Sequence, residues 1–298
     1  MRQFLVDKIL FIAFFSIISL ISYRYYVTNY KYYDIFKNYQ DSINNSNTSD
    51  IILFGSSVEN HTDLKSESTY RISEILDTLT NKKVKHISNP GFYMPIYYSF
   101  VKSISMSRDI QPITFIIPIN MRSFSNTWYG SRYNQFRDID FALSIEIFQN
   151  KEYVNVNQKH KITNGCADEL TYEQFMSGFF LNSEDNELER CVYFNFKIKP
   201  DNYVLKYIDK ILKFNRDQIT LYFYFEPLDY SNLSKIAKDS LDENILFIKD
   251  MLEMANVNYI DLSRSLNSDL FDYKFSVNEH TKQYGKYLTA KFLKDSLL

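Results

Sequence analysis

A short apolar run that ends in a glycine and two serines most constrains the fold of this chain. Residues 51–54 (Ile-Ile-Leu-Phe) are followed by the turn Gly55-Ser56-Ser57. Four large apolar residues bounded by turn residues predict a strand buried on both faces, as in a parallel sheet. Gly55 permits a sharp turn, which brings a serine to the carboxyl edge of the sheet, where open α/β folds bind ligands.

The serines of this turn have two interpretations. The simpler one is an N-cap, in which the hydroxyl of Ser56 or Ser57 accepts a hydrogen bond from a backbone N–H of a following helix. The functional one is a nucleophile, which requires a base within reach. The position of the histidines in the order of strands and helices therefore decides between the two.

The rest of the chain alternates between strand-like and helix-like patterns. Apolar runs predict strands at 84–88, 113–119, 220–225 and 258–262, and helical spacing predicts helices at 67–79, 95–106, 203–214, 232–254 and 280–293. Residues 122–200 interrupt this alternation with an aromatic, polar stretch, which predicts an insertion of the kind that forms lids or substrate surfaces. About five strands alternating with helices predict a parallel, three-layer α/β/α domain with right-handed crossovers.

The N-terminal residues have a different character. Residues 9–23 carry no charge, and as a helix they cover about 22 Å. Extension to Val27, with Arg24 reaching the headgroups, gives roughly 28 Å, close to the hydrocarbon thickness of a bilayer. We expect a transmembrane signal anchor at 1–28 and a polar stalk at 29–50. A cleaved signal peptide is the alternative, although no A-x-A-like site follows the apolar run.

An anchor of this kind implies a single-pass protein of the cell membrane, with residues 51–298 outside the cytoplasm. Basic residues on both sides of the segment leave its orientation open under the positive-inside rule. Outside the cytoplasm Cys166 and Cys191 can form a disulfide, and two buried thiols are the alternative. The net charge of −2, without a basic tract, argues against nucleic acid as a partner.

His280 is the histidine best placed to act as a base. It follows the last expected strand and stands at the start of the last expected helix. In a parallel sheet this position is again the carboxyl edge, so His280 can meet the serine turn although more than 220 residues separate them. Without the serine, a solvent-exposed histidine at a helix start is the simpler interpretation.

The first strand and its turn resemble the first motif block of the SGNH (GDSL-like) hydrolases. In that resemblance Ser57 stands at the position of the nucleophile, and Ser56 replaces the usual aspartate. The same G-S-S variant occurs in the membrane-anchored, DltD-like branch. The resemblance covers residues 50–121 and 201–298 and implies a flavodoxin-like fold, while the insertion at 122–200 has no counterpart in it.

Two later segments resemble the blocks that supply an oxyanion hole. Residues 89–91 (Asn-Pro-Gly) are similar to the second block, and residues 117–120 (Ile-Pro-Ile-Asn) to the third. The resemblance implies that the N–H groups of Ser57 and Gly91, with the Asn120 amide, stabilise the oxyanion of an acyl-transfer reaction.

Residues 277–288 resemble the last block, which implies that His280 is the catalytic base for Ser57. One departure matters, because Val277 stands where the family has the aspartate that orients the histidine. The site then works as a dyad, or a backbone carbonyl or another carboxylate orients the ring. The candidate carboxylates are Asp272, Glu279 and Asp261.

Arg122 and Trp128 follow Asn120 closely and are candidates for a substrate rim. An arginine there can bind phosphate or carboxylate, and an ordinary loop with a buried aromatic is the alternative. No Cys, His or carboxylate cluster has metal-ligand spacing, so we expect no metal and no cofactor.

These features predict a membrane-anchored serine esterase or O-acyltransferase that acts on a cell-envelope glycan or an acylated carrier. The resemblance implies a polytopic membrane acyltransferase as the partner that supplies the acyl group. The alternative from another class is a catalytically inactive SGNH-like module that binds glycan or scaffolds an envelope-modification complex, which Val277 favours. A cytoplasmic nucleotide binder is disfavoured because the first turn lacks G-x-G-x-x-G.

Overall fold

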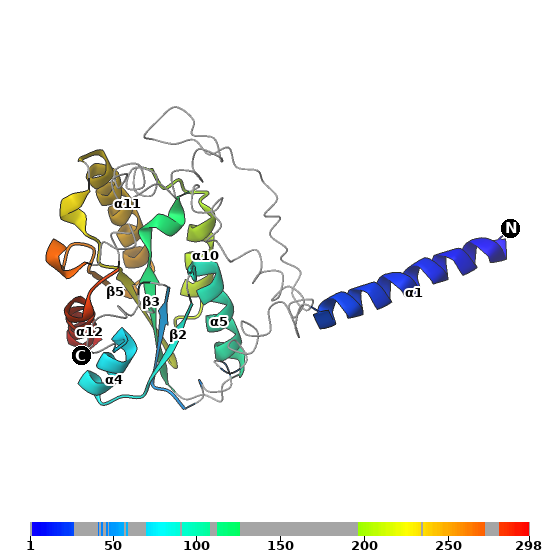
Figure 1. The fold of residues 1–298 in the computed structure, drawn as a ribbon, viewed down its shortest axis with the longest axis horizontal. Coiled ribbons are helices and arrows are strands. Elements are labelled where there is room, and N and C mark those ends of the chain that lie inside the picture. Colours follow the sequence, from blue (N-terminus) through cyan, green and yellow to red (C-terminus); the bar gives the residue numbers. More distant parts are fainter. Residues whose placement is uncertain are drawn as a thin grey trace.

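A sheet of five parallel strands forms the centre of the computed structural model (Figure 1), with the strand order β2-β1-β3-β4-β5. The strands are β1 (Ile51–Gly55), β2 (Val84–Ser88), β3 (Ile113–Ile119), β4 (Ile219–Phe225) and β5 (Asn258–Asp261). This order is that of flavodoxin-like folds, whose ligands bind where β1 and β3 meet at the carboxyl edge. The predicted strands and the parallel α/β architecture are therefore confirmed.

The structure describes part of the chain, namely residues 2–26, 41, 43, 46, 48–56, 58, 70–89, 91–107, 112–125, 196–233, 235–271 and 280–297. Its longer helices are α1 (Arg2–Tyr26), α4 (Ile72–Thr80), α5 (Met94–Ser107), α10 (Tyr203–Leu212), α11 (Lys235–Met254) and α12 (Gln283–Leu297). Short 3-10 helices follow β3, β4 and β5, as η2 (Met121–Phe124), η4 (Tyr230–Asn232) and η5 (Ser268–Leu270).

The sheet is buried on both faces. Along β1, Ile52 and Phe54 belong to a core shared with α5, α10 and α11, whereas Ile51 and Leu53 belong to a core shared with α4 and α12. Figure 1 shows α5 and α10 on one side of the sheet, with α4 and α12 on the other. Each of the four residues is at most 1 % exposed, which explains why β1 is apolar throughout rather than alternating.

Three helices begin later than the sequence pattern predicts. The helix expected from residue 232 starts at Lys235, after η4. The helix expected from residue 67 starts at Ile72, because the carboxylate of Glu74 accepts the backbone N–H of Arg71 at 2.8 Å and defines the helix start there. The helix expected from residue 280 starts at Gln283, because Thr281 forms an antiparallel bridge with Phe271. His280 therefore precedes α12 in an extended segment.

The expected insertion lies mostly outside the described residues, which resume at residue 196. Cys166 and Cys191 fall within the undescribed part. The side chain of Asn244 in α11 holds residues 196–198 in place. Asn244 Oδ1 accepts the Ile198 N–H at 2.8 Å, and Asn244 Nδ2 donates to the Phe196 carbonyl at 2.7 Å. The chain thus returns to the sheet at a defined place before α10.

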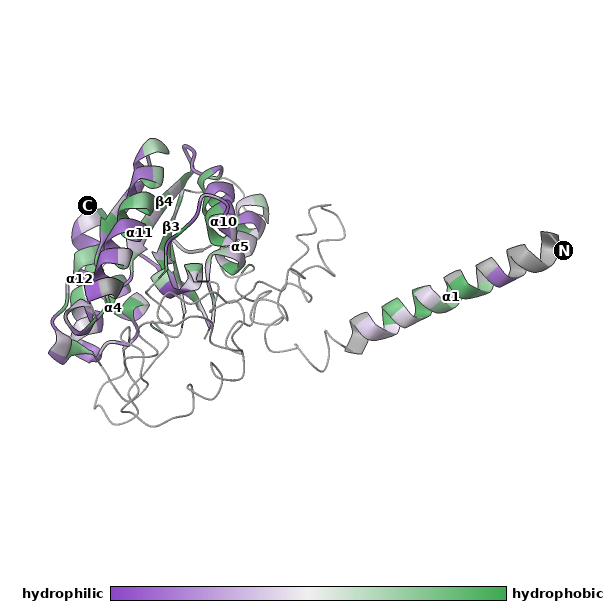
Figure 2. Cartoon of the chain, turned by 90° about the horizontal axis from the view of Figure 1, so that it is seen from above, coloured by the Kyte–Doolittle hydropathy of each residue, from purple (hydrophilic) through white to green (hydrophobic). Residues whose placement is uncertain are grey.

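The N-terminal helix α1 extends over 25 residues. Its large apolar side chains between Phe11 and Tyr23 are 41–64 % exposed, and Figure 2 shows hydrophobic colours along much of its length. In the part of the chain that the structure describes, no helix combines the length and apolar character needed to cross a membrane.

Candidate active site

Polar residues follow directly where β1, β3 and β4 end. Ser56 is the first residue after β1, Asn120 the first after β3, and Glu226 the first after β4. All three are buried, with exposed fractions of 2 %, 5 % and 1 %. Because the strands are parallel, these residues share the carboxyl edge of the sheet, and a buried polar group there needs partners to offset its lost hydration.

The Ser56 hydroxyl takes part in the turn after β1. Its Oγ accepts the backbone N–H of Val58 at 3.2 Å, a local contact by which serine stabilises a turn. Ser56 is therefore the serine whose hydroxyl accepts a backbone N–H of the following residues, the structural role that the sequence allowed for Ser56 or Ser57. Ser57, the expected nucleophile, lies outside the described residues.

Gly91 has a backbone conformation that suits a tight turn. Its φ is 82°, in the region that favours glycine, and the N–H of Phe92 donates to the carbonyl of Asn89 at 3.0 Å. A positive φ at the third position and this hydrogen bond are features of a type II turn. The turn follows β2, so Gly91 reaches the same edge as Asn120.

The side chain of Asn120 is held by Glu226. Asn120 Nδ2 donates to Glu226 Oε2 at 2.6 Å, and both residues are buried. The backbone carbonyl of Asn120 accepts the hydroxyl of Ser123 in η2 at 2.7 Å. The expected oxyanion donor is thus fixed both through its amide and through its main chain.

His280 is 7 % exposed at the entry to α12. The next two residues are fixed against η5 and its end, since Thr281 bridges Phe271 and the Lys282 N–H donates to the Leu270 carbonyl at 2.8 Å. Gly285 allows this approach, because an added Cβ would lie 2.9 Å from Thr281 Cβ. His280 is therefore a buried residue on a braced segment rather than a solvent-exposed histidine.

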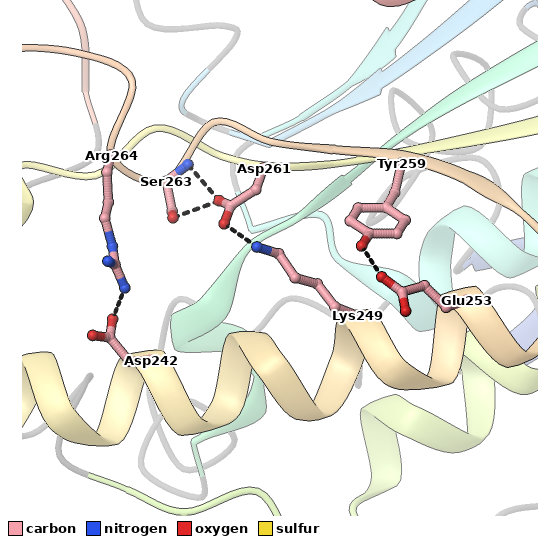
Figure 3. A network of polar contacts seen from close by, with 7 residues as sticks. All are labelled: Asp242, Lys249, Glu253, Tyr259, Asp261, Ser263 and Arg264. Atoms are coloured by element: carbon pink, nitrogen blue, oxygen red, sulfur yellow. Dashed lines mark hydrogen bonds and ion pairs between the residues drawn. The ribbon is translucent and has the colours of Figure 1, made fainter.

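Asp261, one of the candidate orienters of His280, is committed to other partners. Figure 3 shows its carboxylate between Lys249 and Ser263: Oδ2 pairs with Lys249 Nζ at 2.6 Å, while Oδ1 accepts the Ser263 hydroxyl at 2.6 Å and its N–H at 3.0 Å. Burial alone would raise the pKa of Asp261, but these contacts lower it. Lys249 belongs to α11, on the face of the sheet opposite α12. Asp261 therefore braces α11.

The other two candidate orienters, Asp272 and Glu279, lie outside the described residues, as does Val277. The structure thus describes His280 itself, and the group that orients its imidazole stays a prediction.

His86 on β2 is the other histidine in the described part of the chain. Its Nε2 is buried, and its Nδ1 lies 3.4 Å from the Ser88 hydroxyl. Burial, with the positive charges of Arg71, Lys286 and Lys85 nearby, lowers the pKa of His86 to about 3. A neutral imidazole with so low a pKa is a poor general base at neutral pH, which leaves His280 as the better candidate.

Arg122 lies in η2 and is 5 % exposed. Its role at a substrate rim stays a prediction, and Trp128, the other rim candidate, lies outside the described residues. Among the residues that the structure describes, no group of three or more His, Cys, Asp or Glu side chains is arranged to hold a metal ion.

Two buried carboxylates near the site were not singled out from the sequence. Glu226 and Asp229 belong to Glu-Pro-Leu-Asp, the segment directly after β4. Asp229 is 1 % exposed and accepts hydrogen bonds from Ser268 Oγ at 2.6 Å and from Asn232 Nδ2 at 2.6 Å. The available signal was two acids at the end of an apolar strand, a position equivalent to that of Asn120 after β3.

Comparison with known proteins finds likeness in structure without likeness in sequence. No protein-family model matches the sequence, and no curated protein matches it. Solved structures that resemble the chain include a member of the lipolytic protein G-D-S-L family from Veillonella parvula DSM 2008, at 12 % identity and a TM-score of 0.41, covering 81 % of this chain and 93 % of that one.

Two further solved structures are similar in extent. LAE5, an alpha/beta hydrolase enzyme from the metagenome of Lake Arreo, has 10 % identity and a TM-score of 0.44, with 83 % and 94 % of the two chains covered. A variant of Axe2, an acetyl xylan esterase from Geobacillus stearothermophilus, has 9 % identity and a TM-score of 0.42, with the same coverage. Similarity this low carries no argument about activity.

Proposed function

We propose that this chain is a serine esterase or O-acyltransferase of the SGNH type, with Ser57 as nucleophile and His280 as base. The observation that carries the proposal is the burial of Asn120 and His280 at the carboxyl edge, where β1 ends at Gly55 just before the Ser56-Ser57 pair. Polar groups of these types at one sheet edge fit acyl transfer, which needs a nucleophile, a base and oxyanion donors.

The proposed reaction has two steps. In the first, Ser57 Oγ attacks the acyl carbonyl while His280 takes its proton; the bond to the leaving alcohol then breaks as His280 returns that proton to the alcohol oxygen. In the second, water or an acceptor hydroxyl gives its proton to His280 and attacks the acyl-enzyme, and Ser57 leaves with the proton. The chain supplies every group that these steps require.

The negative charge that develops on the carbonyl oxygen needs donors. The N–H groups of Ser57 and Gly91 and the Asn120 amide are the proposed set. Loss of one such donor typically costs on the order of 10²–10³ in rate. The turn that gives Gly91 its φ of 82° supports this role, because the turn fixes the direction of its N–H.

For the orientation of His280 we propose a partner other than Asp261, because the carboxylate of Asp261 is held by Lys249 and Ser263. We therefore propose that a backbone carbonyl, Asp272 or Glu279 performs this role, or that the site works as a Ser–His dyad. A dyad retains nucleophile and base but loses the stabilisation that an acid gives to the imidazolium.

We also propose that residues 1–28, which include α1 and continue beyond it, anchor the chain to the cell membrane as a single-pass segment, with the α/β domain outside the cytoplasm. The exposed apolar side chains of α1, 41–64 % exposed between Phe11 and Tyr23, support an apolar environment for this helix. In that setting the chain acts on a cell-envelope glycan or an acylated carrier, and a polytopic membrane acyltransferase supplies the acyl group.

Labelling with a fluorophosphonate tests the nucleophile in the full chain, purified in detergent. The wild-type chain and Ser56→Ala are expected to label, whereas Ser57→Ala is not, and circular dichroism checks that each variant folds. If wild type and Ser57→Ala label equally and neither cleaves p-nitrophenyl acetate, the proposal that Ser57 is a catalytic nucleophile is wrong. An inactive glycan-binding module is then favoured. Mass spectrometry of an added oligosaccharide then separates transfer from hydrolysis.

A further inference from the structure

Glu226 is a buried carboxylate at the proposed site. Glu226 is 1 % exposed, and its Oε2 accepts the Asn120 amide N–H at 2.6 Å. Its own backbone N–H donates to the Ile119 carbonyl at 3.3 Å. Both its side chain and its main chain therefore contact the end of β3, which carries Asn120.

The parallel register of two strands produces this contact. Every paired position on β3 and β4 is separated by the same number of residues, from Ile113 with Ile219 to Ile119 with Phe225. Asn120 and Glu226 are one residue further along each strand and keep that separation of 106 residues. Residues that are level on neighbouring parallel strands point to the same face, so the two side chains meet without help from a loop.

A carboxylate is energetically unfavourable at a buried position such as that of Glu226. Its burial costs free energy unless hydrogen bonds offset the lost hydration. In return, its Oε2 accepts the Asn120 amide N–H, which fixes which end of the Asn120 amide faces it. With the nitrogen of Asn120 facing Glu226 and one N–H engaged, the second N–H has a defined direction.

We propose that Glu226 is a positioning residue that holds the Asn120 amide so that its second N–H points at the oxyanion. This proposal rests on the function proposed above, in which Asn120 is an oxyanion donor. Glu226 acts through Asn120 and touches no reacting atom. Small displacements of such donors are costly, because their effect depends on alignment with charge that develops in the transition state.

Steady-state hydrolysis of p-nitrophenyl acetate by the full chain tests this role with three substitutions. Glu226→Ala and Glu226→Asp, whose carboxylate is one methylene too short to reach Asn120, are expected to lower kcat by about 10- to 100-fold with KM nearly unchanged. Glu226→Gln is expected to retain most of the activity, because its side-chain oxygen still accepts the Asn120 N–H.

A double-mutant cycle separates positioning from general support of the fold. In the Asn120→Ala background, Glu226→Ala is expected to have little further effect on kcat, because the group that it positions is already absent. Thermal unfolding of each variant identifies those that fold, and Glu226→Asp replaces Glu226→Ala in the cycle should the latter not fold.

Three outcomes overturn the positioning role: activity of Glu226→Asp equal to wild type, a loss in Glu226→Gln as large as in Glu226→Ala, or fully additive effects of the Glu226 and Asn120 substitutions. Ser57→Ala separates these from failure of the proposed function. If Ser57→Ala keeps wild-type activity, the proposed function fails whatever Glu226 does. If Ser57→Ala is inactive while any of the three outcomes occurs, the role of Glu226 alone fails.

Discussion

Asp229 accepts a hydrogen bond from the hydroxyl of Ser268 at 2.6 Å, and this contact joins the loop after β4 to η5. The end of η5 then supports the segment that carries His280, through the Leu270 carbonyl and the Phe271–Thr281 bridge. The loop after β4 therefore braces the expected base as well as the expected oxyanion donor, since it begins with Glu226.

Asp229→Ala is expected to destabilise the fold and to lower activity together. It removes the acceptor of hydrogen bonds from the partly buried Ser268 hydroxyl and the exposed Asn232 amide, and loss of such a hydrogen bond typically costs about 0.5–1.5 kcal/mol. The His280 segment also loses its anchor, so kcat for ester hydrolysis falls. Urea unfolding and steady-state kinetics measure the two effects.

Asn232→Ala is the matched control, because it removes a contact of Asp229 within η4 and leaves Ser268 in place. It is expected to cost stability with a smaller loss of kcat. Equal losses of kcat in the two variants would contradict the brace between Asp229 and η5.

Much of the fold is predictable because its strands are short apolar runs bounded by turn residues. Strand β3 is predicted over its observed bounds, Ile113–Ile119, and Asn120, which directly follows it, is singled out by its resemblance to the third motif block. The pairing of Asn120 with Glu226 is not predictable in the same way, because it depends on the register of β3 against β4. The register is set by how side chains of both strands pack on the two faces of the sheet. The residue pattern within one strand therefore does not specify it.

The start of α12 shows a second limit of sequence patterns. Helical spacing extends back to His280, but pairing of Thr281 with Phe271 keeps the chain extended until Gln283. A contact ten residues away along the chain thus overrides the local preference. A contact between distant residues also explains Asp261. Its position in the sequence made it a candidate to orient His280, but its carboxylate pairs with Lys249 of α11.

Gly91→Ala is expected to destabilise the turn after β2 and to slow catalysis. A φ of 82° costs a residue with a Cβ roughly 1–2 kcal/mol, and relaxation of the turn redirects the N–H at this position. We expect a lower urea midpoint and a reduced kcat with KM nearly unchanged. A Gly91→Ala variant with wild-type kcat would remove this N–H from the proposed oxyanion hole.

Asp261→Asn is expected to cost stability at neutral pH and to leave catalysis almost unchanged. The lowered pKa of Asp261 means that its ionised form stabilises the fold above the ordinary carboxyl range, and that this stabilisation is lost as the pH falls through the lowered pKa. The variant should therefore show a weaker loss of stability in acid than wild type. If it instead shifts the pH–rate profile near neutrality, Asp261 orients His280 after all.

His86→Gln is expected to make stability less dependent on pH below neutrality. Burial and the nearby positive charges lower the pKa of His86 from 6.5 to about 3 in the folded chain. Between these two pH values His86 is protonated in the unfolded chain and neutral in the folded chain. Stability from this residue is therefore present above pH 6.5 and falls as the pH drops towards 3, by up to about 1.4 kcal/mol per pH unit.

Urea unfolding of the wild type and His86→Gln between pH 7.5 and pH 4.5 measures this term as the difference between two curves, in which other titrating groups cancel. The wild-type curve should fall more steeply than the His86→Gln curve as the pH decreases. Arg71→Gln provides a graded control, because it removes one of the charges that lower the pKa of His86 while the backbone contact of Arg71 with Glu74 can persist. Its dependence on pH should lie between the other two, whereas parallel curves for all three chains would mean that His86 accepts a proton equally well in the folded and unfolded states.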